Sequence, residues 1–498
     1  MLTLCYGAFG TGKTTRLLEE IAADIAGGIP SFLVVPEQNT VSVEGRAARR
    51  LPPEAPLLFE VTNFTRLADT VFRRVGGVSA RYADEGTAML LARDATAAVA
   101  PLLSDRRRPD AERIREVMGA HTRFLPTTDR EEALRGADAV IITVFNGDVD
   151  VWRHEIEIPK KYGVDINVGD TRSVSGIFRA LRNIPLMIEI CRDVERLCPH
   201  AVVLNYTNPM SMLCLAMQSE TKADVTGLCH SVQGTSRMLA EWAGADPDTL
   251  KYTCLGINHQ AFFTELRADG KDLYPILREK IATKEYYGKE KVRNEIFRTF
   301  GYYVTESSGH NSEYVAWFRK RPDLIEKYCS PDEGANWNPG EYAFSLRLRS
   351  DPNRFQNDLD TWYAKPVDPE RGQEYAAYIL NARLGDGTPF EFNANLPNEG
   401  SVENLPYDAC VEIPVVATKE GYRRVFQGKM PQGPAALVTY TANIESLAVE
   451  AWRQKSRDLA VQAVSLDPLT SAVLSLEEVR QMCDELFEVN RDFLGDYK

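Results

Sequence analysis

The residues best able to do chemistry near the start of the chain form one run, Gly7-Ala8-Phe9-Gly10-Thr11-Gly12-Lys13-Thr14. The run matches GxxxxGK[ST], in which glycines let backbone N–H groups surround phosphates, a lysine reaches the β- and γ-phosphates and a threonine holds Mg²⁺. A nucleotide-binding loop is therefore predicted, and a glycine-rich turn without a ligand is the alternative. Its candidate binding residues are Gly7, Gly10, Gly12, Lys13 and Thr14.

A second group of reactive side chains follows three apolar runs, DAVIITVF (138–145), HAVVLNYTNP (200–209) and ADVTGLCHS (223–231). Each run precedes a helix-like pattern, and this alternation predicts a doubly wound parallel sheet. Ligands of such sheets bind where the strands end at their carboxyl edge. The side chains expected to gather at that edge are those of Asn205, Asn208, Cys229 and His230.

The elements around the glycine-rich run are the ones a phosphate loop needs. Residues 2–7 form a short apolar run, residues 14–28 have helical apolar spacing and end in Gly-Gly, and residues 31–38 resemble a buried strand stopped by Pro36. The front of the chain is therefore predicted to be a strand, loop, helix and strand.

Length and composition bound the protein further. A chain of 498 residues with 44% hydrophobic residues is expected to form two or three globular domains. Its net charge of -13 gives no indication of the overall positive charge that is typical of proteins that bind nucleic acid. The nine cysteines include no CxxC pair, so a disulfide framework or zinc ribbon is not expected. No signal peptide or long apolar segment is evident, and we predict a cytoplasmic protein without a membrane partner.

Composition changes partway along the chain. Lys13 is the only lysine before residue 104, and all six tryptophans lie after the charged stretch 104–113. We interpret this change as a junction between two unrelated sequences. The predicted domains are 1–103, a junction at 104–111, the Rossmann-like part at 112–200 and a mixed α+β catalytic region at 201–498.

Residues 1–103, including LVVPEQNTVSVE (33–44), resemble the N-terminus of the B subunit of bacterial ATP-dependent helicase-nucleases. That family needs a long remainder to bind and cleave nucleic acid, and nothing after residue 103 resembles it. The resemblance therefore implies a P-loop βαβ fragment rather than a DNA motor.

From about residue 112 to 495 the chain resembles glycoside hydrolase family 4, and within it the α-galactosidases. The motifs that carry the resemblance are TTDREEALRGADAVI (127–141), EIPKKYGVDINVGDTRSVSGIFRALRNIP (157–185), LNYTNPMSM (204–212), GLCHSVQGT (227–235), GINHQAFF (256–263), FGYYVTESSGHNSEY (300–314) and LDPLTSAVLSLEEVR (466–480).

The resemblance implies a reaction that differs from two-carboxylate glycoside hydrolysis. In members of the family NAD⁺ transiently takes hydride from the sugar C3 carbon, which acidifies the C2 proton. A base removes that proton, the C1–O bond breaks by elimination, water adds, and NADH returns the hydride. A divalent metal, usually Mn²⁺, polarises the C2 and C3 oxygens.

The same resemblance implies roles for individual residues. Cys229 and His259 correspond to the two metal ligands, His230 to the acid that protonates the leaving group, and Asn208 to a substrate-binding asparagine. By chemistry alone Cys229 could be a core thiol and His259 a hydrogen-bonded core histidine. Both residues lie in motifs that resemble the family's, and these motifs favour the role of metal ligand.

Four further assignments rest on the same motifs. Tyr302 is the candidate base that removes the C2 proton. Tyr303 lies next to it in the same motif, and a tyrosine that serves only in packing is the alternative. Asp170 and Thr171 are expected to border the nicotinamide, and His310 to line the substrate pocket. Exposed polar loop residues without a role are the alternative for these three.

The chain departs from the family at its front, because the usual strand and glycine-rich dinucleotide loop are replaced by the helicase-like fragment. One hypothesis is that Gly7, Gly10 and Gly12 serve the pyrophosphate instead. The leading prediction is an NAD- and metal-dependent hydrolase of α-galactosides that forms homo-oligomers. An ATP-binding DNA-repair module and an inactive fusion are the alternatives.

Overall fold

The computed structural model describes two units of the chain. One lies within residues 1–126, and the other is formed by residues 127–329 and 374–498. The described residues are 21–23, 31–34, 59–62, 127–147, 149–329 and 374–498.

In the first unit, β1 (Ser31–Val34) and β2 (Phe59–Thr62) pair as parallel strands, and residues 21–23 are helical. The expected helix over 14–28 and strand over 31–38 are confirmed where the structure describes them. The nucleotide-loop candidates lie outside the described residues, so their role stays a prediction, as do the domain boundaries at 103 and 111. Those candidates are Gly7, Gly10, Gly12, Lys13 and Thr14.

The second unit begins with the predicted parallel strands. β3 (Ala139–Ile142), β4 (Val202–Asn205) and β5 (Asp224–Gly227) lie side by side in that order, in parallel register. A helix follows each strand, and the Rossmann-like fold expected from the apolar runs is confirmed. On β4, Val203 packs in one hydrophobic cluster whereas Val202 and Leu204 pack in another, because successive strand residues face opposite sides of a sheet covered on both faces.

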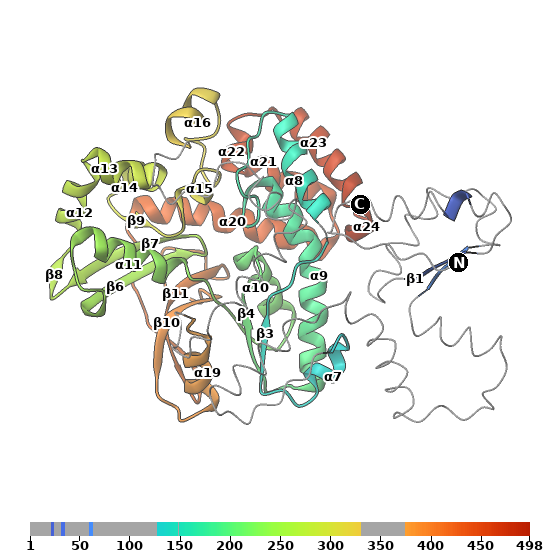
Figure 1. The fold of residues 1–498 in the computed structure, drawn as a ribbon, viewed down its shortest axis with the longest axis horizontal. Coiled ribbons are helices and arrows are strands. Elements are labelled where there is room, and N and C mark those ends of the chain that lie inside the picture. The colour runs from blue at the N-terminus through green and yellow to red at the C-terminus, as the bar shows by residue number, and fades with distance from the viewer. Residues whose placement is uncertain (1–20, 24–30, 35–58, 63–126, 148, 330–373) are drawn as a thin grey trace. The chain divides into compact units, whose positions relative to one another are not determined.

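An antiparallel part extends this sheet. The order continues from β5 through β10 (Phe390–Pro397), β11 (Cys410–Thr418), β6 (Leu250–Ile257) and β7 (Gln260–Ala268) to β8 (Lys271–Asp272) (Figure 1). β9 (Tyr303–Val304) pairs with β7, and β12 (Gly421–Arg424) pairs with β11. The sheet is therefore mixed, and its antiparallel strands come from the C-terminal half of the chain.

Helices cover both faces of the sheet. Their bounds are α7 Arg130–Leu134, α8 Val149–Lys161, α9 Ser173–Leu197, α10 Met210–Glu220, α11 Ser231–Ala243, α12 Tyr274–Ile281, α13 Lys284–Lys289, α14 Lys291–Phe300, α15 Ser308–Asn311, α16 Pro322–Tyr328, α19 Ala376–Leu384, α20 Gln432–Gln454, α21 Arg457–Leu466, α22 Pro468–Ser471, α23 Leu476–Val489 and α24 Arg491–Leu494, with a 3₁₀ turn at Pro247–Thr249. Within the described residues, no helix is long and apolar enough to cross a membrane.

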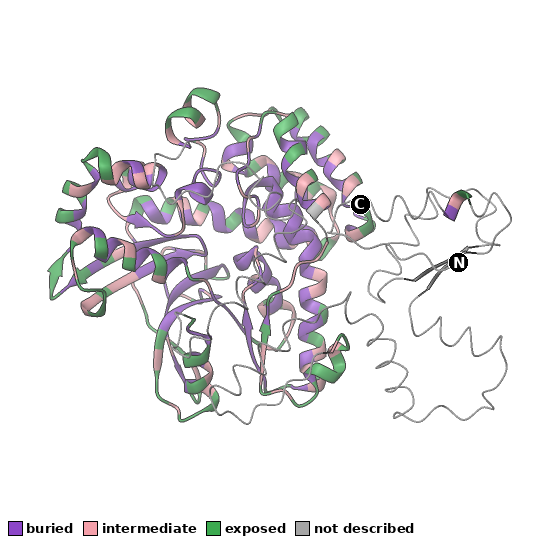
Figure 2. Ribbon diagram, viewed as in Figure 1, coloured by how far each residue is buried: buried purple, intermediate pink, exposed green. Residues whose placement is uncertain are grey.

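The largest core cluster surrounds α9, which packs against α8, α10 and α20. Figure 2 shows strand β4 and the N-terminal half of α9 mainly in the colour of buried residues. Inside this core Arg182 and Glu155, both fully buried, form an ion pair, and Arg182 also donates to the side chain of Asn490 at 3.0 Å. The core thus anchors the middle of α9, whose N-terminal end directly follows the loop that carries Asp170 and Thr171.

Candidate active site

Three side chains meet at the carboxyl edge of the sheet. Cys229 lies between β5 and α11, His259 lies in the two-residue turn between β6 and β7, and Glu306 follows β9. His259 and Glu306 have backbone φ angles of 62° and 68°, a conformation that costs energy for residues other than glycine. Such strain at two adjoining polar side chains is typical of a functional site.

The potential ligand atoms of Cys229, His259 and Glu306 all lie within 4.8 Å of one another. Ligands held at about 2.0 to 2.3 Å from one ion are separated by up to about 4.6 Å, so the cluster has nearly the right size for a metal. A sulfur, an imidazole nitrogen and a carboxylate oxygen form a donor set suited to a transition metal. Cys229 and His259 were predicted from their motifs, whereas Glu306 was not, although it lies inside the motif that contains Tyr302 and His310.

The ring of His259 is oriented by its neighbours. Its Nδ1 lies 3.1 Å from the hydroxyl of Tyr314 and 3.3 Å from that of Thr171, while its Nε2 lies 3.4 Å from a carboxylate oxygen of Glu306. Burial lowers the pKa of His259 to about 4, so the ring is neutral near pH 7. A neutral ring held through Nδ1 leaves Nε2 available to a metal ion.

The surroundings of the Cys229 thiol favour its protonated form, and a nearby cation would favour the thiolate. Burial, together with the carboxylates of Glu412 and Glu306, raises the pKa of the Cys229 thiol to about 12. A bound divalent ion reverses this preference, because a coordinating thiol loses its proton. The arrangement therefore fits a metal better than it fits an empty cluster of acidic groups.

His310 and Asp170 support the cluster from one side. Nδ1 of His310 lies 3.4 Å from a Glu306 oxygen, and Nε2 lies 3.5 Å from an Asp170 oxygen. Asp170 also accepts a hydrogen bond from the hydroxyl of Thr171 at 2.7 Å. Burial acts to lower the pKa of His310, but the carboxylates of Glu306 and Asp170 outweigh it and raise the pKa to about 9. The structure thus brings Asp170, Thr171 and His310 together with the metal cluster.

His230 stands at the rim of the site. Its side chain is 56% exposed, and its Nε2 lies 2.8 Å from Glu374, which also accepts a hydrogen bond from Tyr206. The rings of His230 and Tyr206 are stacked with centroids 5.7 Å apart. A solvent-facing histidine held by a carboxylate can exchange protons with a ligand, and Glu374 is a second residue that sequence reasoning missed.

Asn208 follows β4 at the same edge. The buried carboxamide oxygen of Asn208 has no hydrogen-bond partner among the described residues. A buried polar atom without a partner costs free energy, so a ligand that donates a hydrogen bond there would be favoured. This observation agrees with the substrate-binding role predicted for Asn208.

Tyr302 contacts residues other than the three side chains of the candidate metal cluster. Its ring packs edge-on against Tyr274, and it borders a cavity of about 360 Å³ with Arg267 and Arg278. The described contacts do not join Tyr302 to the metal cluster, and its role as base stays a prediction. The hydroxyl of neighbouring Tyr303 is buried and donates to Asn294 at 3.0 Å, so Tyr303 has a structural role.

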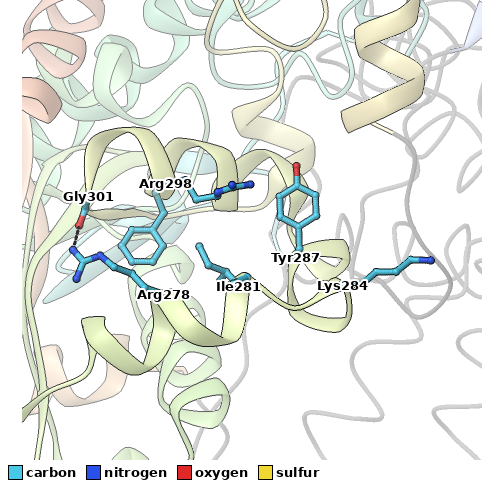
Figure 3. A pocket seen from close by; sticks show the side chains of 8 residues that line it. Arg278, Ile281, Lys284, Tyr287, Arg298 and Gly301 are labelled. Carbon is cyan, nitrogen blue, oxygen red and sulfur yellow. Dashed lines mark hydrogen bonds between the residues drawn. The ribbon is translucent and has the colours of Figure 1, made fainter.

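A larger cavity of about 640 Å³ lies between α12, α13 and α14 (Figure 3). Its labelled lining includes the cations Arg278, Lys284 and Arg298 and the ring of Tyr287. None of the three ligand residues lines it, so size alone does not locate the chemistry of this protein.

A buried acid lies beneath the cluster. Glu412, on β11 opposite Asn395, is fully buried, and neither of its carboxyl oxygens has a hydrogen-bond partner in the described part of the chain. Burial, with the negative charge of Glu306, raises the pKa of Glu412 to about 8. Glu412 is therefore mostly protonated near neutral pH.

A Rossmann-like sheet extended by antiparallel strands, with three side chains at its carboxyl edge that could hold a metal ion, defines an α/β fold with a candidate metal site. The chain belongs to family 4 of the glycosyl hydrolases: residues 104–245 match "Family 4 glycosyl hydrolase" and residues 254–470 match "Family 4 glycosyl hydrolase C-terminal domain". Residues 4–98 match "ADDB, N-terminal". Both resemblances inferred from the sequence are thereby confirmed.

Two relatives are α-galactosidases. The chain is 37% identical over 385 residues to that of Bacillus subtilis, covering 74% of this chain and 84% of the relative. It is 36% identical over 396 residues to that of Rhizobium meliloti, covering 78% and 80%.

Two solved structures share the fold. One is a 6-phospho-β-glucosidase of Thermotoga maritima with manganese, NAD⁺ and glucose-6-phosphate, at a TM-score of 0.62 and 21% identity, covering 78% of this chain and 90% of that one. The other is a 6-phospho-α-glucosidase from gut microorganisms with NAD and Mn²⁺, at a TM-score of 0.62 and 21% identity, covering 75% and 85%.

Proposed function

We propose that this family 4 glycosidase hydrolyses α-galactosides and requires NAD and a divalent metal, with Mn²⁺ the first candidate. The observation that carries the proposal is the cluster of Cys229, His259 and Glu306, whose ligand atoms lie within 4.8 Å. Support for the cofactors comes from the two solved structures of the same fold, which contain NAD and manganese. Support for the substrate comes from the two α-galactosidase relatives.

The residues of the site divide the work as follows. Cys229, His259 and Glu306 would hold the metal, which supplies a Lewis acid for sugar oxygens while NAD supplies a hydride acceptor. Asn208 would bind a sugar hydroxyl through its unpartnered carboxamide oxygen. His230, which Glu374 orients at 2.8 Å, would give a proton to the leaving oxygen.

The neighbouring loop would complete the pocket. Asp170 and Thr171 would border the nicotinamide, and His310 would hold both Asp170 and Glu306 in place. Tyr302 is the sequence-based candidate for the residue that removes the C2 proton.

The test is hydrolysis of a nitrophenyl α-galactoside with NAD⁺ and Mn²⁺, compared with the α-glucoside and α-galacturonide. We expect the galactoside to be preferred, activity to be lost in Cys229→Ser or with a chelator, and C2-deuterated substrate to react more slowly. The matched control is Cys198→Ser. Cys198 caps the C-terminal end of the 25-residue helix α9, whereas the Asp170 loop of the site precedes the N-terminal end of that helix. Preference for another glycoside, or activity in Cys229→Ser with no isotope effect, would refute the proposal.

ATP binding is a second candidate, favoured by the match of residues 4–98 to the ADDB N-terminal family. It requires Lys13, and loss of ATP binding in Lys13→Ala is its test. Cytoplasmic location and homo-oligomer formation stay predictions, and light scattering of the purified chain checks the second.

A further inference from the structure

The loop that carries Asp170 and Thr171 is held from several sides, and one segment contacts it along its length. Trp152 donates to the carbonyl oxygen of Val168 at 3.1 Å, and Arg172 at the end of the loop donates to Glu445 at 3.0 Å. The loop is residues 165–172, between α8 and α9, and the holding segment is residues 307–319, which begins with α15. Arg319 donates to the backbone oxygen of Asp165 at 2.8 Å, and Tyr314 stacks under the guanidinium of Arg172 at 4.8 Å. The two segments therefore meet at both ends of the loop.

Glu313 makes the central contact. One of its carboxylate oxygens accepts hydrogen bonds from the backbone N–H groups of Asn167 at 2.6 Å and Val168 at 2.7 Å. The other oxygen accepts from the N–H of Gly169 at 3.0 Å. Glu313 is fully buried, so water does not compete for these bonds.

Three successive N–H groups that converge on one carboxylate form a concave anion site in the backbone. Charge-assisted hydrogen bonds of this kind are about twice as strong as neutral ones. Without the carboxylate, the three donors would be buried without an acceptor, and the loop would change shape to reach water or other acceptors.

The loop has little freedom to keep its shape by itself. Gly169 has a φ of 68°, and a Cβ on Gly176 would lie 2.5 Å from the carbonyl carbon of Thr171. The loop therefore packs directly on the first turn of α9, and a small shift would move the next two residues. Those residues are Asp170, which contacts His310, and Thr171, which contacts Nδ1 of His259.

We propose that Glu313 is a positioning residue of the active site: its carboxylate sets the loop at 167–169, and the loop in turn sets Asp170 and Thr171 against His310 and the metal ligand His259. Its effect on turnover rests on the proposed function. Its effect on metal affinity does not, because metal binding is measured without substrate.

The test uses the full chain and three variants. Glu313→Ala removes the carboxylate, Glu313→Gln keeps the volume but turns an amide N–H₂ toward a backbone N–H, and Glu488→Ala removes an exposed acid as the matched control. Mn²⁺ affinity is measured by electron paramagnetic resonance, the melting temperature is measured in parallel, and both are repeated with added formate.

We expect Glu313→Ala and Glu313→Gln to bind Mn²⁺ about 10- to 100-fold more weakly, as is typical when a residue that orients a metal ligand is lost. Formate should occupy the vacated anion site in Glu313→Ala and restore Mn²⁺ affinity in a saturable way, with no effect on Glu313→Gln, Glu488→Ala or the unaltered chain. If the galactoside is a substrate, kcat should fall and recover with formate in parallel.

Two results would overturn the inference. One is wild-type Mn²⁺ affinity in Glu313→Gln, which remains decisive if Glu313→Ala does not fold. The other is formate that raises the melting temperature of Glu313→Ala without restoring Mn²⁺ affinity, which would make Glu313 a purely structural residue. Absence of α-galactosidase activity in the unaltered chain would instead count against the proposed function alone.

Discussion

Cys229 and His259 differ in whether they must release a proton before they can bind a metal ion. His259 is already neutral near pH 7, because burial lowers its pKa to about 4. Cys229 still carries its proton, because burial and nearby carboxylates raise its pKa to about 12. The pH dependence of metal binding should therefore report the thiol rather than the imidazole.

We predict that Mn²⁺ affinity rises about tenfold per pH unit between pH 6.5 and 8.5, because binding releases at least the Cys229 proton. Calorimetry in buffers of different ionisation enthalpy measures the protons released. An affinity that does not change with pH would contradict this assignment. Cys229→Ser should bind far more weakly at every pH.

Glu412 provides a stability prediction at the same scale. The pKa of Glu412 is raised to about 8, above its value in the unfolded chain, so folding takes up a proton at neutral pH. Stability from this group is fully present below the unfolded pKa and is lost as the pH rises through about 8. Glu412→Gln should therefore flatten the pH dependence of the metal-free protein, and its stability relative to wild type should increase by about 2.5 kcal/mol between pH 6 and pH 8.5.

Urea unfolding at pH 6 and pH 8.5 measures this difference. The control is Glu488→Gln, whose side chain is 62% exposed and which should leave the slope unchanged. Equal slopes for Glu412→Gln and wild type would show that Glu412 is ionised in the folded protein.

At the scale of elements, helix α9 joins the core to the site. Its N-terminal end carries the Asp170 loop, and its middle is anchored by the fully buried pair of Arg182 and Glu155. Breaking a buried pair leaves an uncompensated charge, whereas an exposed pair contributes little.

We predict that Arg182→Met lowers the free energy of unfolding by about 3 to 5 kcal/mol, because Glu155 is left buried and unpaired. The exposed pair of Arg491 and Glu488 is the control, and Arg491→Met should change stability by less than about 0.5 kcal/mol. Denaturant unfolding measures both. Similar losses in the two variants would mean that burial does not decide the effect of this pair.

At the scale of the whole molecule, a family 4 glycosidase is joined to a fragment with a nucleotide-binding motif. We expect the two parts to bind different cofactors. NADH should stabilise the chain through the family 4 part, whereas ATP with Mg²⁺ can act only through Lys13 and its loop.

We predict that NADH at about 100 times its Kd stabilises the chain by about 2.7 kcal/mol, in wild type and in Lys13→Ala alike. Thermal unfolding with NADH, with ATP–Mg²⁺ and with neither measures the effect. A shift with ATP alone would leave the front fragment as the only working site. No shift with either ligand would favour an inactive fusion.

Several features of this protein were predicted from short, continuous stretches of its sequence. Apolar runs before helical patterns predicted β3, β4 and β5, and the motifs GLCHS and GINHQ predicted Cys229 and His259, because each of these signals lies within a few neighbouring residues. The motif around Tyr302 also contained Glu306, but nothing in the neighbouring residues distinguished that partly buried acid from the exposed glutamates elsewhere in the chain.

Tertiary structure alone decided the contacts between distant segments. Glu313 and Gly169 are 144 positions apart, and only the packing of 307–319 on the Asp170 loop turns an ordinary glutamate into an acceptor for three backbone donors. Glu412 acquires its raised pKa from burial between strands that are far apart in the chain. The sequence by itself determined the family and the parallel strands, and it singled out Cys229 and His259, two of the three side chains of the candidate metal cluster. Which acids join those ligands depended on burial and on long-range pairing, which no local pattern records.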